Sequence, residues 1–77
     1  MSTLRDCVRE ARHRAQLTMD EAAALAGLSG RSGWHRHEHH EPSHRTAARL
    51  VAAVLPDATL ACDGAGWRLL LPQNEGG

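Results

Sequence analysis

Three side chains with nitrogen donors lie close together near the middle of the chain: Arg31, His35 and Arg36. An arginine guanidinium presents a planar fork of N–H donors, which fits two phosphate oxygens or the O6/N7 edge of guanine. Every basic residue other than histidine in this chain is arginine, and none is lysine. Long cationic donors on one short helix predict insertion of that helix into a groove of DNA.

The segment 18–42 supplies the elements that would position these donors. Thr18 and Glu21 form the pattern of a capping box, in which each side chain accepts a hydrogen bond from the other's backbone amide. A helix is expected from here through Ala26, and Gly27 is expected to end it in the left-handed conformation. A second short helix follows, so the segment predicts two helices joined by a tight turn.

The second helix of this pair has weak local signals. Ser29 or Ser32 is expected to cap it, but Gly30 and Gly33 each disfavour a helix interior by about 1 kcal/mol relative to alanine. We therefore expect Trp34 to hold this helix by packing into the core.

Two further helices are expected around this pair. The first spans about 3–15, with Thr3 and Asp6 at its start, and the last begins after Ser43 and ends before Pro56. The apolar residues of the first recur at helical spacing and are Leu4, Cys7, Val8, Ala11 and Ala15. Those of the last are Ala47, Leu50, Val51 and Val54.

The character of the chain changes after residue 57. Segments 58–62 and 67–71 are typical of two strands joined by a glycine-rich turn. A lone hairpin is marginal in water, and an apolar edge favours pairing with a second copy. We expect a homodimer with contacts from Trp67, Leu69, Leu70 and Leu71. Residues 72–77 are expected to form a flexible tail.

Length and charge indicate one small domain. The 77 residues carry nine acidic and nine basic side chains, but residues 1–49 hold eight arginines against six acids, so the positive charge lies with the helices. Cys7 and Cys62 lie far apart, and no apolar run is long enough to cross a bilayer. We expect reduced thiols, no membrane role and a cytoplasmic location.

These pieces together resemble the Cro/C1-type (lambda-repressor-like, Xre) helix-turn-helix family. The resemblance rests on TMDEAAALAGLS, WHRHE and PSHRTAARLVAAVL, which follow the first helix in the family's order, and it covers about residues 3–55. It implies a mainly α fold, with a four-helix DNA-binding domain over 3–55 followed by the β-hairpin at 58–71. The chain departs from the family pattern by one extra residue, Gly30, and by His37 and His40 where an apolar residue and glycine are usual.

The resemblance also implies roles for individual residues. The base-contacting residues would be Arg31, Ser32, His35 and Arg36, with Arg36 first. Phosphate contacts would come from Thr18, Met19, Ser43, His44 and Arg45, partly through backbone amides at helix starts. Arg12 and Glu38 match positions that in some members form an ion pair between the first and third helices.

Five histidines lie within ten residues, at 35, 37, 39, 40 and 44, a density typical of metal-binding tracts. His35 and His39 could share a helix face near Glu41, but a proline interrupts the array and no cysteine is close, so we expect neither a metal nor another cofactor. We interpret the tract, with His39 and His40, as phosphate neighbours. Their protonation would raise DNA affinity as the pH falls from about 8 to about 6.

These features predict a sequence-specific DNA-binding transcriptional regulator, most simply a Cro-like or operon-autoregulating repressor. It would act as a homodimer on a palindromic operator, in the bacterial nucleoid or in the cytoplasm of a phage-infected host. Two alternatives stay open: an antitoxin or phage adaptor whose hairpin and tail bind another protein, and a metal-responsive switch built on the histidines. Catalysis is not expected, because no serine or cysteine has a base at a recognisable spacing.

Overall fold

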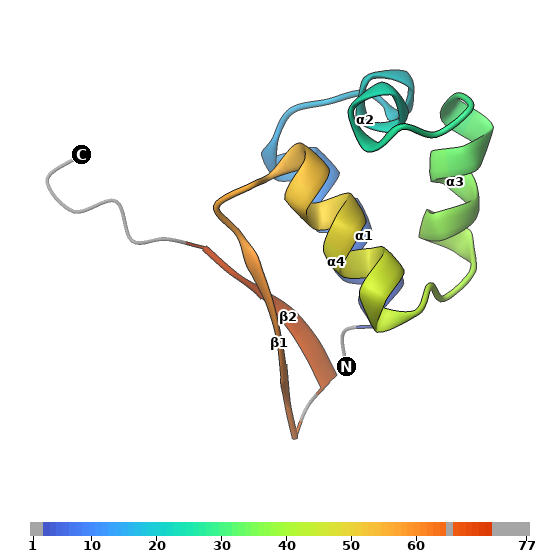
Figure 1. Ribbon diagram of the computed structural model, residues 1–77. Coiled ribbons are helices and arrows are strands. Elements are labelled where there is room, and N and C mark those ends of the chain that lie inside the picture. Colours follow the sequence, from blue (N-terminus) through green and yellow to red (C-terminus); the bar gives the residue numbers. More distant parts are fainter. Residues whose placement is uncertain (1–2, 65, 72–77) are drawn as a thin grey trace, which may run out of the picture.

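The computed structural model describes residues 3–64 and 66–71, and the predicted tail over 72–77 lies outside them. The described chain is mainly helical and ends in a two-stranded antiparallel hairpin, as predicted. Its elements are α1 (Leu4–Arg14), α2 (Met19–Ala26), α3 (Arg31–His39), α4 (His44–Val54), β1 (Thr59–Asp63) and β2 (Gly66–Leu70). In Figure 1, α3 and the hairpin lie on opposite sides of the α1–α4 pair. None of the described helices is long and apolar enough to cross a membrane.

Three helices begin at the caps that the sequence predicts. The hydroxyl of Thr3 accepts from the third amide of α1 at 3.3 Å, that of Thr18 from α2 at 3.1 Å, and that of Ser43 from α4 at 3.2 Å. Gly27 ends α2 with φ of 74°, in the left-handed region. These helix limits are set by local hydrogen bonds, and for that reason the sequence alone located them.

The predicted cap of α3 is wrong. Neither Ser29 nor Ser32 caps this helix; Gly30 precedes its first residue, with no side-chain hydrogen bond. The φ of Gly30 is 133°, a conformation that side chains disfavour. The extra residue of the turn is therefore placed where only glycine fits easily. The helix continues through His39.

The core lies where the four helices meet. Trp34 of α3 is fully buried in a cluster of apolar residues from all four helices. Cys7 is 1% exposed on the α1 stripe, as expected for a small apolar core residue. Because the core has one large side chain and otherwise mostly Ala, Val and Leu, the position of α3 depends on that indole.

The hairpin pairs β1 with β2 from Thr59 opposite Leu70 to Asp63 opposite Gly66. Trp67 and Leu69 are partly buried against the helical core of the same chain, and their contact with a second copy stays a prediction. The α1–α4 pair offers them apolar surface within the chain, which the strand pattern could not indicate. Leu70 remains 43% exposed, and Leu71, beyond the end of β2, 38%.

Candidate nucleic-acid interface

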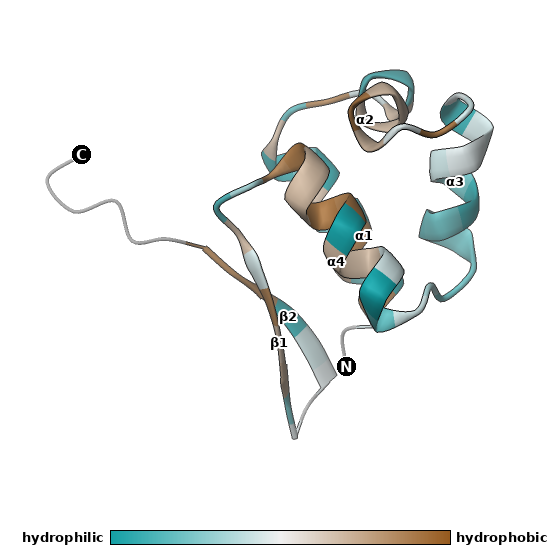
Figure 2. Cartoon of the chain, in the orientation of Figure 1, coloured by the Kyte–Doolittle hydropathy of each residue, from teal (hydrophilic) through white to brown (hydrophobic). Residues whose placement is uncertain are grey.

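Helix α3 has two chemically distinct faces. Its exposed side chains include all four predicted base-contacting residues, namely Arg31, Ser32, His35 and Arg36. Trp34 and Glu38 are buried on the opposite face. Figure 2 shows hydrophilic or near-neutral colours along α3, whereas α4 alternates hydrophobic and hydrophilic segments. The helix thus presents polar donors outward and is anchored on its opposite face by Trp34 and Glu38.

A buried ion pair connects this anchor to α1. The Arg12 Nε donates to Glu38 Oε2 at 2.6 Å, and the side chains are only 15% and 3% exposed, so the ion pair implied by the resemblance is present. The Trp34 Nε1 donates to the same carboxylate, and Arg12 Nη1 donates to the carbonyl of Leu17 at 3.1 Å. Burial raises the pKa of Glu38, but the hydrogen bonds from Arg12 and Trp34 outweigh it and hold this pKa below its usual value.

The arginines divide into two groups according to their partners. Four pair with carboxylates on α1, α3 or the hairpin: Arg9, Arg12, Arg14 and Arg68. Five others are exposed and pair with no described carboxylate: Arg5 on α1, whose Nη1 donates to the His39 carbonyl, Arg31 and Arg36 on α3, and Arg45 and Arg49 on α4. A formally neutral chain therefore carries four guanidiniums with no described hydrogen-bond or carboxylate partner, and all four lie on α3 and α4. Arg49 was not among the residues predicted to contact DNA, although the helical spacing of the apolar residues of α4 indicates that Arg49 is exposed.

The start of α4 differs in detail from the predicted phosphate site. The Ser43 hydroxyl donates to Thr46 Oγ1 at 3.0 Å and accepts from the Thr46 amide, so it is engaged within the first turn. The His44 ring stacks on Trp67 of β2, with ring centroids 4.7 Å apart and planes 26° apart. His44, predicted to contact a phosphate, and Trp67, predicted to contact a second copy, thus lie against each other. Arg45 stays exposed, as predicted.

The predicted contacts at the start of α2 also have internal partners. The Thr18 hydroxyl accepts from the Glu21 amide, and the Met19 side chain packs against the core. A phosphate at this position could still accept hydrogen bonds from the Thr18 hydroxyl and from the Met19 amide, which lies at the positive end of the α2 dipole.

The histidines do not converge on one point. His35 and His39 share a face of α3, as predicted, with ring centroids 3.9 Å apart, and His40 is exposed beyond the helix end. Within residues 3–64 and 66–71, no group of three His, Cys, Asp or Glu side chains could hold a metal ion. His37 is partly buried, and this burial, together with the Arg36 charge, lowers its pKa.

Glu41 has a structural role that the sequence analysis missed. Its carboxylate accepts from the amides of Leu4 and Arg5, at 3.0 and 3.1 Å, and so caps α1 from the loop between α3 and α4. The Arg5 Nη1 donates to the His39 carbonyl at 3.2 Å beside it. No local pattern signals a cap from 37 residues away.

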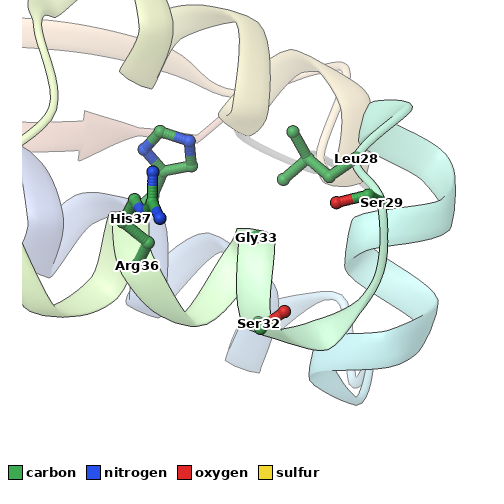
Figure 3. Close-up of a pocket in the computed structure, with 6 residues that line it drawn as sticks. All are labelled: Leu28, Ser29, Ser32, Gly33, Arg36 and His37. Atoms are coloured by element: carbon green, nitrogen blue, oxygen red, sulfur yellow. The ribbon is translucent and has the colours of Figure 1, made fainter.

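A hollow of about 310 Å³ lies along α3 beside the candidate base-contacting face. Leu28 and Ser29 of the preceding turn line it together with Ser32, Gly33, Arg36 and His37 of α3. Figure 3 shows Gly33 between the Leu28 side chain at one end and the Arg36 and His37 side chains at the other.

Comparisons with protein-family models, with curated proteins and with solved structures find no match to this chain.

Proposed function

We propose that this protein is a sequence-specific DNA-binding regulator with a lambda-repressor-like helix-turn-helix, which inserts α3 into the major groove. One observation carries the proposal. Uncompensated, exposed Arg31 and Arg36 project from a helix whose opposite face is fixed by Trp34 and Glu38. A helix in the major groove needs both features, because donors must reach the base edges while their backbone stays in place.

The charge distribution supports a defined orientation on the duplex. Arg45 and Arg49 of α4 are also exposed without a described carboxylate partner. Phosphate contacts from these side chains and from the amides at the start of α4 would set the register, while α3 contacts the bases.

Selection of bound sequences from random duplex DNA tests the proposal. A conserved consensus is expected, and Arg36→Ala should weaken binding to it by about 5- to 150-fold and relax one base position. Arg68→Ala is the matched control, since it removes the same charge from the 63% exposed side chain on the hairpin. Absence of any consensus, or equal losses for the two variants, would contradict the proposal.

A homodimer is part of the same proposal. The exposed Leu70 and Leu71 at the end of β2 support self-association there. Two chains per duplex and a two-fold symmetric consensus, with half-sites about 34 Å apart, are the expected result. Binding of one chain per site, or copurification with a different protein, would favour an adaptor instead.

The histidine tract predicts a pH dependence of this binding. Exposed His35, His39 and His40 lie on α3 or just beyond its end, on the side proposed to meet DNA, and the expectation from the sequence is that affinity rises as the pH falls from about 8 to about 6. His37 should contribute least, because its pKa is lowered by burial and by Arg36. Anisotropy titrations at fixed salt measure the effect, and a flat profile would contradict it.

A further inference from the structure

A second hollow, of about 560 Å³, lies where the end of α2 and the turn after it meet α4 (Figure 1). On the α4 side it is lined by Thr46, Arg49 and Ala53, which share one face of the helix because they are three and four residues apart. Leu25 and Leu28 line it on the α2 side. We call it the α2–α4 hollow. Its volume is within the range of about 300–1,000 Å³ that small-molecule sites occupy.

Most of the residues that line the α2–α4 hollow are apolar. Leu25 is 58% exposed, more than any other large apolar side chain among the described residues. Leu50, which also lines the hollow, is 4% exposed and belongs to the core, so the hollow is continuous with the apolar interior. The alanines at 26, 52 and 53 are too short to fill the space between α2 and α4. A ligand with an apolar body would therefore remove Leu25 from water without displacing the core.

The polar part of the hollow carries one full positive charge. Arg49 is exposed and has no carboxylate or hydrogen-bond partner among the described residues. None of the described lining residues is acidic. His37 of α3 also lines the hollow, and because burial and the Arg36 charge lower its pKa, its ring is uncharged at neutral pH and can donate one N–H. The hollow is thus complementary to a single negative charge next to an apolar body.

We propose that the α2–α4 hollow binds a small amphiphilic carboxylate, whose apolar body lies on Leu25 and the alanines while its carboxylate accepts hydrogen bonds from Arg49. A small ligand fits better than a flat protein surface, because residues of α2, α3 and α4 border the hollow on different sides. The inference does not rest on the proposed function, since the binding is measured without DNA. Failure of one therefore leaves the other standing.

Octanoate is a suitable probe, titrated into the isotope-labelled full chain at neutral pH and fixed salt while amide signals are followed by NMR. Saturable shifts are expected at the residues that line the hollow. Heptanoate and hexanoate should bind more weakly, by about two- to fourfold for each methylene removed. Octylammonium has the same chain with the opposite charge and should not saturate the site.

Two variants separate the charged part of the site from the apolar part. Arg49→Gln should weaken octanoate binding by about fivefold, the value for an exposed ion pair, and leave the binding of 1-octanol unchanged. Arg45→Gln is the matched control, because Arg45 is exposed on the same helix but does not line the hollow. Leu25→Ala should weaken octanoate and 1-octanol by the same factor, since it removes apolar contact alone.

Several results would overturn the inference: shifts that do not saturate, octylammonium binding as tightly as octanoate, or equal losses of octanoate affinity in Arg49→Gln and Arg45→Gln. A concentration-dependent dimer that Leu25→Ala abolishes would also overturn it, because a second copy of the chain would then occupy the hollow. Sedimentation of the wild-type chain and of this variant tests that outcome.

Discussion

Removal of the Arg12 side chain should destabilise the domain far more than removal of another arginine from the same helix. Arg12 and Arg14 both belong to α1, and both hold a glutamate through Nε, at 2.6 and 2.7 Å. The pairs differ in burial: the side chains are 15% and 3% exposed in Arg12–Glu38, but 50% and 45% in Arg14–Glu10.

The expected loss of stability for each variant follows from this difference in burial. Arg12→Ala leaves the buried Glu38 carboxylate with only the Trp34 N–H as a donor, which should lower the free energy of unfolding by about 3 kcal/mol. Arg14→Ala removes an exposed pair on one helix, a change of about 0.3–0.5 kcal/mol. Because a domain of 77 residues has a total stability of about 4–12 kcal/mol, the first change removes a quarter or more of it. The expected decrease in Tm is about 12–24 °C.

Urea and thermal unfolding, followed by circular dichroism, measure both variants. Alanine is the best helix former, so helix propensity contributes no loss at either position. Arg12→Lys keeps the charge without the fork of donors and should give an intermediate loss, which is measurable if Arg12→Ala does not fold. Equal losses for Arg12→Ala and Arg14→Ala would refute the reasoning from burial.

Three further outcomes are expected. A thiol reagent at pH 8 should modify exposed Cys62 at once and Cys7 only after unfolding, because burial raises the pKa of Cys7 to about 11; two equally fast thiols would contradict this. Stability in urea should fall as the pH drops below about 4.5, because the folded-state pKa of Glu38 lies below that of the unfolded chain, which takes up the proton first; constant stability from pH 6 to pH 3 would argue against it. Thr18→Ala should lower the free energy of unfolding by about 1 kcal/mol in the same assay through loss of the α2 cap, and an unchanged value would show that the cap contributes nothing.

Features encoded within four or five residues could be predicted from the sequence. The capping hydroxyls of Thr3, Thr18 and Ser43 and the left-handed Gly27 each need only neighbouring backbone groups, and all four were located. The residues on the exposed face of α3 were implied by the family resemblance, and the weak local signals of this helix led to the prediction that Trp34 anchors it.

Features that depend on the approach of distant segments could not be predicted in this way. The alternation of residues in the strand that contains Trp67 is the same whether the indole packs on its own chain or on a second copy. Its packing against the helical core of its own chain depends on the assembled α1–α4 surface. The start of α3 was misplaced because the serine pattern of a cap is common, whereas the positive φ of Gly30 comes from the turn as a whole.

The carboxylate of Glu41 makes the first turn of α1 dependent on a loop that the chain synthesises much later. Two backbone amides, those of Leu4 and Arg5, therefore lose their acceptor whenever the α3–α4 connection moves away. Their rate of exchange with deuterated solvent should report how often that connection opens.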